Sequence, residues 1–292
     1  MSLDTARTVD EAVRAATQML GPRTDTARFD AEVLMAHALG VSRSELFLRR
    51  MGDAPPPHFA ELVLRRAGHE PVAHIVGSVG FWGLDFVVTP HVLIPRGDSE
   101  TLIEAAVQAF AGAPPRRVLD LGTGSGCLLL AALHEWPDAE AVGIDRSDAA
   151  LAVATDNARR LPGTNGPARL LRRDWTQGGW AQGLGQFDLV LANPPYVEDE
   201  AALEPSVRDH EPGGALFAGP EGLDDYRLLL PQLPALLTPG GIAMVEIGAS
   251  QAPAVEAIAA AAGFTATLHL DLADRPRALE LKIPLGKAGD SA

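Results

Sequence analysis

The four-residue sequence Asn193-Pro194-Pro195-Tyr196 follows an apolar stretch, FDLVLA, that is typical of a buried strand. Two consecutive prolines stiffen the backbone and remove two N–H donors, so the Pro194 carbonyl is free to accept a hydrogen bond from a ligand. The side-chain carbonyl of Asn193 is a second acceptor beside it. This pair fits the two coplanar N–H groups of an –NH₂ group on an sp² carbon, and Tyr196 can stack on a flat substrate. A stiff loop without a chemical role is the alternative.

A glycine-rich turn precedes this motif in the chain. It reads Asp120-Leu121-Gly122-Thr123-Gly124-Ser125-Gly126 and joins an apolar strand to an apolar helix. Glycines allow a tight turn and a close approach of the backbone to a ligand. A dinucleotide-binding turn has the spacing GxGxxG, whereas GxGxG after an acid suits the amino-acid part of S-adenosylmethionine.

Two further positions complete a nucleoside site. Asp145 ends the second strand, where a carboxylate can bind both ribose hydroxyls, and Asp174-Trp175 ends the third, where a polar group and an aromatic face could hold adenine. Helix capping by Asp145 and simple packing of Trp175 are the alternatives. The residues expected to bind the cofactor are Gly122, Thr123, Gly124, Ser125, Gly126, Asp145, Asp174, Trp175 and Asn193.

Methyl transfer to an amide nitrogen is the chemistry that these two sites favour together. An amide nitrogen is a poor nucleophile because its lone pair is delocalised into the carbonyl. Acceptors for both N–H groups let negative character build on nitrogen during attack, and alignment with the methyl donor lowers the barrier. We therefore expect Asn193, Pro194, Pro195 and Tyr196 to bind the substrate and to be catalytic. No general base is needed before attack, and the eight histidines show no metal-ligand spacing, so no metal is expected.

Alternating strands and helices must position these residues. The pattern predicts an α/β fold with a Rossmann-like, mostly parallel seven-stranded sheet, closed by an antiparallel hairpin at its edge. The strands are expected at 117–121, 141–145, 168–174, 187–193, 241–248, 265–270 and 277–282.

The chain is expected to contain two domains. Residues 1–72 form a small all-α domain with helices over 8–20, 25–40, 42–50 and 58–68. A β-hairpin linker rich in β-branched and aromatic residues covers 73–93. The catalytic domain covers 94–285, and 286–292 is expected to be a disordered tail.

The charge distribution narrows the choice of partners. The formal charge is −14; residues 1–78 contain 9 Lys+Arg and 10 Asp+Glu, and the remainder contains 15 and 28. Since nucleic-acid affinity comes mainly from neutralising phosphates, duplex DNA is disfavoured. Cys127 is the single cysteine, so no intrachain disulfide can form. The sequence shows no signal-peptide pattern and no apolar run of about 18 residues. We expect a cytoplasmic monomer with neither nucleic acid nor a membrane as partner.

Along most of its length the chain resembles the release-factor glutamine methyltransferases of the PrmC/HemK type. The resemblance is strongest over 70–100 (EPVAHIVGSVGFWGLDFVVTPHVLIPRGDSE), 118–128, 193–196 and 209–248. It implies a class I methyltransferase domain that uses S-adenosylmethionine, and a helical N-terminal domain that docks the substrate. The implied substrate is the glutamine of the Gly-Gly-Gln loop of class 1 peptide chain release factors. It also implies that Gly122 to Gly126, Asp145 and Trp175 contact the cofactor and that Asn193 to Tyr196 hold the glutamine.

The chain departs from the family pattern at two places. The usual Arg-Pro-acid-Thr-acid reads Arg96-Gly97-Asp98-Ser99-Glu100, so Gly97 loosens a loop that proline would stiffen, and His74 replaces a usual tyrosine. Three other functions remain open on sequence alone: an exocyclic-amine DNA methyltransferase, a ribosomal-protein glutamine methyltransferase, and a non-catalytic module that senses S-adenosylmethionine.

Overall fold

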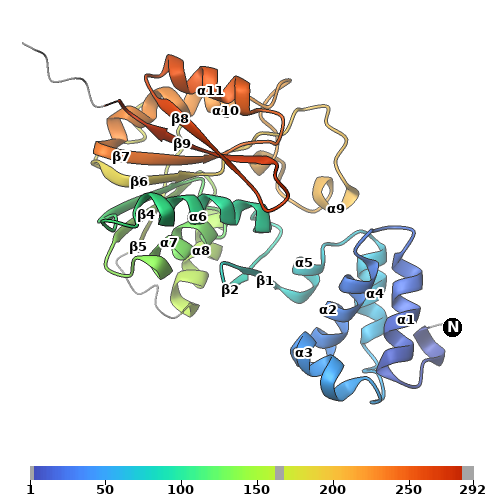
Figure 1. Cartoon of the computed structure of the whole chain (residues 1–292). Coiled ribbons are helices and arrows are strands. Elements are labelled where there is room, and N and C mark those ends of the chain that lie inside the picture. The colour runs from blue at the N-terminus through green and yellow to red at the C-terminus, as the bar shows by residue number, and fades with distance from the viewer. Residues whose placement is uncertain (1–2, 162–167, 285–292) are drawn as a thin grey trace, which may run out of the picture. The chain divides into compact units, whose positions relative to one another are not determined.

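The computed structural model describes residues 3–161 and 168–284, so the tail predicted over 286–292 lies outside the described residues. Two compact units make up the chain (Figure 1). The helical unit comprises Met1–Ser78 and Leu203–Glu211, and the sheet unit comprises Val79–Ala202 and Pro212–Ala292. The chain therefore enters the helical unit a second time shortly after Tyr196. The domain boundaries expected at residues 72 and 93 stay a prediction.

Short helices make up the helical unit, and most of them pack around one apolar core. They are η1 (Leu3–Thr5), α1 (Val9–Leu20), α2 (Ala27–Leu39), α3 (Arg43–Glu45), the π-helical turn η2 (Leu46–Arg50), α4 (Phe59–Ala67), α5 (Val72–Val76) and α9 (Pro205–Arg208). Thr8 caps α1 by accepting a hydrogen bond from the Glu11 N–H, and Gly40 ends α2 in the left-handed conformation. The buried charge of Asp30 is neutralised by Arg66, whose Nε lies 2.6 Å away.

A β-hairpin lies within the stretch predicted for it, but it is shorter. β1 (Ser78–Phe81) and β2 (Leu84–Val87) form the hairpin, whereas the first residues of the predicted 73–93 stretch belong to helix α5. The turn consists of Trp82 and Gly83, both with positive φ, which matches the twist of a two-residue hairpin. Gly77 ends α5 in the left-handed conformation, so a helix stop precedes the first strand.

Seven strands form the sheet in the order β5-β4-β3-β6-β7-β9-β8. Their bounds are β3 (Arg117–Leu121), β4 (Glu140–Asp145), β5 (Ala168–Arg172), β6 (Phe187–Ala192), β7 (Leu237–Glu246), β8 (Thr265–Leu270) and β9 (Pro276–Lys282). The first five strands pair in parallel, and β9 pairs antiparallel with both β7 and β8. The predicted parallel sheet with an antiparallel edge hairpin is therefore confirmed.

Helices cover both faces of this sheet because its side chains alternate between two apolar layers. Leu119, Leu121 and Val190 pack with α10 (Asp224–Leu229), the 3₁₀-helix η5 (Leu230–Leu236) and α11 (Ala252–Ala261). Val118 and Leu189 pack on the other side. That side carries α6 (Glu100–Ala109), α7 (Cys127–Glu135) and α8 (Asp148–Arg160). The central strands are thus buried on both faces, as expected for parallel strands.

The register of the central strands brings three strand ends together. β3 lies between β4 and β6, and Leu121 pairs with Ile144 on one side and Ala192 on the other. The residues that follow these strands therefore emerge at the same edge of the sheet, the position at which open α/β sheets bind ligands. None of the described helices is long and apolar enough to cross a membrane.

Candidate active site

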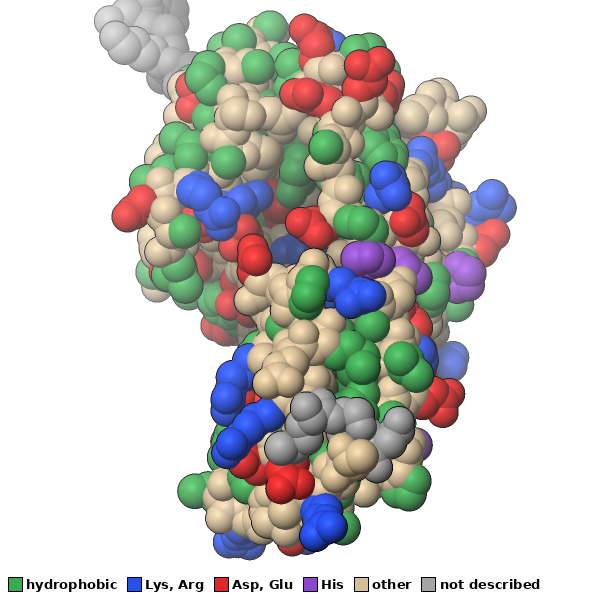
Figure 2. All heavy atoms as spheres, turned by 90° about the vertical axis from the view of Figure 1, so that its right-hand side faces the viewer, with side chains coloured by type: hydrophobic (Ala, Val, Ile, Leu, Met, Phe, Trp, Pro, Cys, Tyr) green, Lys and Arg blue, Asp and Glu red, His purple; other side chains and the backbone are tan. Residues whose placement is uncertain are grey.

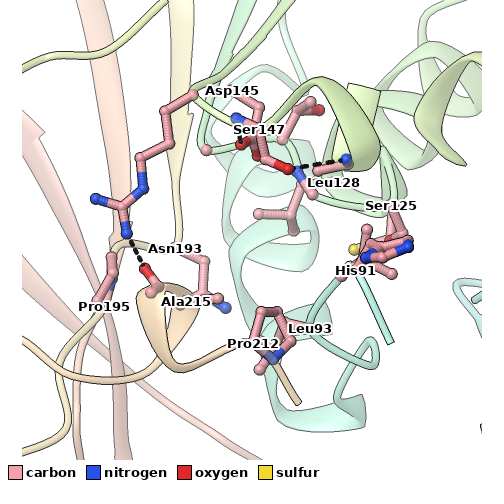
Figure 3. A pocket seen from close by; sticks show the side chains of 18 of the residues that line it. His91, Leu93, Ser125, Leu128, Asp145, Ser147, Asn193, Pro195, Pro212 and Ala215 are labelled. Atoms are coloured by element: carbon pink, nitrogen blue, oxygen red, sulfur yellow. Dashed lines mark hydrogen bonds between the residues drawn. The ribbon is translucent and has the colours of Figure 1, made fainter. Parts of the chain in front are cut away.

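A pocket opens at this carboxyl edge of the sheet, and it contains most of the residues predicted from the sequence (Figure 3). The predicted residues that line it are Gly122, Thr123, Gly124, Ser125, Asp145, Asp174, Trp175, Asn193 and Pro195. Gly126, Pro194 and Tyr196 are not among its lining residues. In the described part of the chain no cluster of His, Cys, Asp or Glu is arranged to hold a metal ion.

The glycine turn is anchored to the end of β4 and needs two of its glycines for backbone shape. The N–H groups of Gly122 and Thr123 both donate to the Ile144 carbonyl, at 2.9 and 2.8 Å. Gly122 and Gly124 have φ values of 73° and 55°, which side chains disfavour. The backbone is therefore held open toward the pocket without any side chain at these two positions.

Gly126 has a packing role, and its predicted contact with the cofactor stays a prediction. It caps the N-terminus of α7 with φ of 83°, and a Cβ there would lie 3.3 Å from the Ala154 Cβ and from the Leu130 Cδ1. The missing side chain lets α8 approach α7 closely.

Asp145 links the glycine turn to the start of α8. Its Oδ2 accepts a hydrogen bond from the Gly124 N–H at 3.0 Å, and its Oδ1 accepts one from the Ser147 N–H at 2.8 Å (Figure 3). Ser147, not Asp145, caps α8. Each carboxylate oxygen can accept a second hydrogen bond, so Asp145 retains acceptor capacity for a pair of hydroxyl groups.

Asp174 and Trp175 follow β5, and each side chain is held by a hydrogen bond to a neighbouring residue. The Trp175 Nε1 donates to Asp225 at 2.9 Å, so a carboxylate of α10 fixes the indole ring. Burial raises the pKa of Asp225. Although burial opposes its charged form, hydrogen bonds from the hydroxyl and N–H of Thr176 hold the pKa of Asp174 below its usual value. The pocket therefore presents a charged group beside a fixed aromatic side chain.

The backbone of the Asn193–Tyr196 turn is held in place by neighbouring residues. Gln251 donates a hydrogen bond from Nε2 to the Tyr196 carbonyl at 2.9 Å. Gly222 packs so tightly that a Cβ there would lie 2.2 Å from the same oxygen. The Tyr196 hydroxyl donates a hydrogen bond to Glu246 at 3.3 Å. The pKa of Tyr196 is raised, mainly because the side chain is buried and secondly because the charge of Glu246 disfavours a tyrosinate. The stacking role expected for Tyr196 stays a prediction.

Asp120 lies buried beneath the glycine turn. It accepts a hydrogen bond from the Thr123 hydroxyl at 2.6 Å, while its Oδ1 has no hydrogen-bond partner in the described parts of the chain. Burial raises its pKa to about 7. The unpartnered Asp120 Oδ1, next to the glycine turn, fits a cofactor that carries an ammonium group. The Asp145 and Asp174 carboxylates fit the hydrogen-bond donors of a nucleoside.

Several lining residues were not predicted as site residues. The segment from His91 to Arg96 and the segment Pro212–Ala215 both contribute to the pocket, together with Ser99, Arg146 and Ser147. Arg146 donates a hydrogen bond to the Gly214 carbonyl at 2.6 Å and so joins two of these segments (Figure 3). For the first two segments, the only sequence signal was their place in the stretches 70–100 and 209–248, where the family resemblance is strong. Neither stretch has a spacing of residue types that indicates a binding or catalytic role.

Comparison with known proteins gives matches to both units. The residues 11–77 match a family model described as the PrmC N-terminal domain, and residues 98–209 match the methyltransferase small domain. The "Release factor glutamine methyltransferase" of Caulobacter vibrioides is 43% identical over 246 residues, which cover 82% of this chain and 84% of that protein. The protein of the same name from Cereibacter sphaeroides is 41% identical over 281 residues, or 94% of this chain and 98% of its own length.

A solved structure supports the fold alone. The hMettl16 catalytic domain, in complex with the MAT2A 3'UTR hairpin 6, has a TM-score of 0.54 and 15% sequence identity, covering 76% of this chain and 82% of that one.

Proposed function

The chain belongs to the release factor glutamine methyltransferase family, and from this premise we propose that it methylates N5 of the glutamine in the Gly-Gly-Gln motif of class 1 peptide chain release factors. It is an enzyme that uses S-adenosylmethionine as methyl donor. The observation that carries the proposal is that Asn193 and Pro195 line the same pocket as Gly122, Gly124 and Asp145.

The cofactor is proposed to occupy the part of the pocket near the glycine turn. Gly122, Thr123, Gly124 and Ser125 would face its amino-acid part, Asp145 its ribose hydroxyls, and Asp174 with Trp175 its adenine. When bound, S-adenosylmethionine supplies a methyl group activated by a positively charged sulfonium. Gly126, at the N-terminus of α7, is proposed to close the turn around the cofactor and to support it through its close packing with α8.

The carboxamide of the substrate is proposed to bind at the Asn193–Tyr196 turn. Asn193 Oδ1 and the Pro194 carbonyl oxygen would each accept one N–H of the glutamine side chain and so fix its nitrogen. As attack proceeds, these two acceptors stabilise the increasing positive character of the N–H hydrogens. The rigid turn keeps the acceptors in place without reorganisation, because Gly222 and Gln251 hold its backbone.

The helical unit is proposed to dock the release factor. Phe29, Phe47 and Leu48 are exposed on it, with 51%, 41% and 81% of their surface accessible, and the Arg43 guanidinium lies 4.5 Å from the Phe29 ring centre. Exposed aromatic side chains together with arginine are typical of protein interfaces. We further propose a cytoplasmic monomer, a setting that suits a chain with a single cysteine.

The charge pattern supports a protein substrate over duplex DNA. Acidic and basic side chains are interspersed on the face shown in Figure 2, so that face offers no extended basic surface to phosphates. A ribosomal-protein glutamine would fit the same acceptor pair, and the names of the relatives favour the release factor.

Mass spectrometry of purified substrates tests the proposal. A release factor incubated with this protein and S-adenosylmethionine should gain one methyl group on the Gly-Gly-Gln glutamine. The Asn193→Ala variant should lose this activity and still bind the cofactor, because the remaining predicted contacts are intact. Transfer of labelled methyl to DNA or to a ribosomal protein, with none to the release factor, would show that the substrate is wrong.

A further inference from the structure

A buried asparagine on α8 bonds the glycine turn without lining the pocket. Only 1% of the surface of Asn157 is accessible, and it is not among the lining residues. Its side chain makes three hydrogen bonds, all of them to backbone atoms. Since a buried carboxamide has to satisfy its donors and its acceptor, these partners show what Asn157 holds in place.

The first partner is the end of the β-hairpin. The Val87 N–H donates to the Asn157 Oδ1 at 2.8 Å, and the Asn157 Nδ2 donates to the Val87 carbonyl at 3.0 Å. The carboxamide thus bonds both backbone groups of one residue, across 70 positions of the chain. Val87 is the last residue of β2. The point at which the chain leaves the hairpin is therefore fixed to α8.

The second partner is the glycine turn. The Asn157 Nδ2 donates a hydrogen bond to the Ser125 carbonyl at 2.9 Å. The N–H groups of Gly122 and Gly124, earlier in the turn, bond Ile144 and Asp145 at the end of β4. The turn is therefore held from two sides, by β4 at its start and by α8 near its end.

The Asn157 carboxamide fits between these partners in one orientation. Its oxygen faces an N–H group, and its NH₂ group faces two carbonyl oxygens. If the group were flipped, donor would meet donor at the Val87 N–H, and acceptor would meet acceptor at both carbonyls. One planar group therefore links Val87 to Ser125.

Both partners lead directly to the pocket. Ser125 lines it, and the Ser125 hydroxyl is buried without a hydrogen-bond partner in the described parts of the chain. Leaving a buried hydroxyl unpaired is costly, so this group favours a ligand that bonds it. The chain that leaves β2 at Val87 also reaches the pocket, which it lines with His91 and Leu93 (Figure 3).

We propose that Asn157 is a positioning residue that couples the end of the hairpin to the glycine turn, so that Ser125 and the segment after β2 hold the cofactor as one unit. This inference rests on the proposed placement of S-adenosylmethionine at the glycine turn. Without the Asn157 donors, the Ser125 carbonyl and the hairpin end can move independently. Cofactor binding then has to order both of them, which weakens it.

Removal of the two donors tests the proposal. Asn157→Asp keeps the shape and the acceptor for the Val87 N–H, but its carboxylate cannot donate to the two carbonyls. The KM for S-adenosylmethionine should rise roughly ten-fold, since two buried carbonyls lose their partner. With saturating cofactor, kcat should stay within about three-fold, because the three hydrogen bonds do not involve the Asn193–Tyr196 turn. An unchanged KM would overturn the proposal.

A matched control lies on the same helix. The Thr155 hydroxyl donates to the Leu151 carbonyl at 2.7 Å, so Thr155→Val removes a hydrogen bond within α8 and leaves the turn and the hairpin untouched. It should keep the wild-type KM for the cofactor. An equal rise of KM in Thr155→Val and Asn157→Asp would show that general loosening of α8 is responsible, and would refute the coupling.

A double-mutant cycle shows whether Asn157 acts through Ser125. The Kd for S-adenosylhomocysteine, the product left after methyl transfer, is measured by calorimetry for Ser125→Ala, Asn157→Asp and the double variant. If Asn157 positions Ser125, the loss of affinity in the double variant is smaller than the product of the two single losses. Losses that simply multiply would contradict the proposal.

Hydrogen–deuterium exchange of the unmutated protein gives a measurement that does not depend on how a variant folds. Val87 is not among the lining residues of the pocket. S-adenosylhomocysteine should nevertheless slow exchange of the Val87 N–H, because the turn and the hairpin end open together. The N–H groups of β8, at the edge of the sheet, should exchange at an unchanged rate. A Val87 N–H that does not respond to the ligand would overturn the coupling.

The same measurements separate this inference from the proposed function. If Ser125→Ala leaves the Kd for S-adenosylhomocysteine unchanged, the proposed placement of the cofactor is wrong, and the inference fails with it. If Ser125→Ala weakens binding while Asn157→Asp does not, the cofactor placement stands and the inference alone is refuted.

Discussion

A side chain on Gly122 would meet the ring of Trp175, since an ideal Cβ at Gly122 lies 3.1 Å from the indole Cη2. The close fit brings the end of β3 and the segment after β5 against each other at the pocket wall. Trp175 is fixed from behind by Asp225, so the ring cannot move away without breaking a hydrogen bond.

Gly122→Ala should therefore weaken cofactor binding. The added methyl must displace either the indole or the turn, and the positive φ adds a cost of about 1–2 kcal/mol for a residue with a Cβ. We expect the Kd for S-adenosylmethionine, measured by calorimetry, to rise about ten-fold or more. Gly112→Ala is the control, because nothing lies within 4 Å of a Cβ at Gly112. An unchanged Kd in Gly122→Ala would show that the turn does not face the cofactor.

Gly126→Ala should instead affect stability more than binding. Its Cβ would lie 3.3 Å from Ala154 and Leu130, so α8 must shift, and φ is again positive. We expect the free energy of unfolding to fall by about 1–3 kcal/mol, measured with urea. The cofactor Kd should change less than in Gly122→Ala. A rise in the cofactor Kd as large as that in Gly122→Ala, with an unchanged free energy of unfolding, would instead indicate that Gly126 contacts the cofactor directly.

Trp175→Phe should test the hydrogen bond between Trp175 and Asp225. The variant keeps an aromatic face but leaves the partly buried Asp225 without its indole donor, at a cost of about 1–3 kcal/mol in the free energy of unfolding. Combining it with Asp225→Leu, which removes the unpaired carboxylate, should recover part of that loss. Additive losses in the double variant would mean that the two residues do not interact.

Glu246→Gln should change the pH dependence of stability. The pKa of Glu246 is raised from 4.5 to about 7 in the folded protein, so the native state holds a proton that the unfolded state loses between these values. The contribution of Glu246 to stability is therefore present below about pH 4.5 and is lost as the pH rises through about 7. The free energy of unfolding of the wild type, relative to Glu246→Gln, should fall over this range and stay level above it. A difference independent of pH would contradict the shift.

Local sequence signals were enough to predict the sheet and most of the pocket. Buried strands such as 117–121 and 187–192 stand out as short apolar runs, and the glycine turn and Asn193-Pro194-Pro195 follow them directly. Once the strands are parallel and adjacent, the residues after them must share an edge. The position of Asp145 beside Gly124 follows from the same rule.

The supporting residues could not be predicted because their roles depend on contacts between distant segments. Ser99 meets Asn193 across 94 positions of the chain, and Asp225 meets Trp175 across 50. A serine before a helix or an aspartate at a helix start has an ordinary local explanation as a cap, so nothing in the sequence distinguished them. Helix α5 was not predicted because its local sequence indicates the wrong structure. Ile75 and Val76 favour strands, but Ile75 packs in the core of the helical unit as part of a helix.

The return of residues 203–211 to the helical unit makes that unit a composite of two separate stretches of the gene. A fragment that stops near residue 77 would lack Leu203–Glu211, including helix α9, which belong to the same compact unit. The compact unit is therefore not one continuous stretch of sequence. Exchanging it between relatives to alter which partner is recognised would require both stretches to be transplanted together, and the second begins only seven positions after Tyr196.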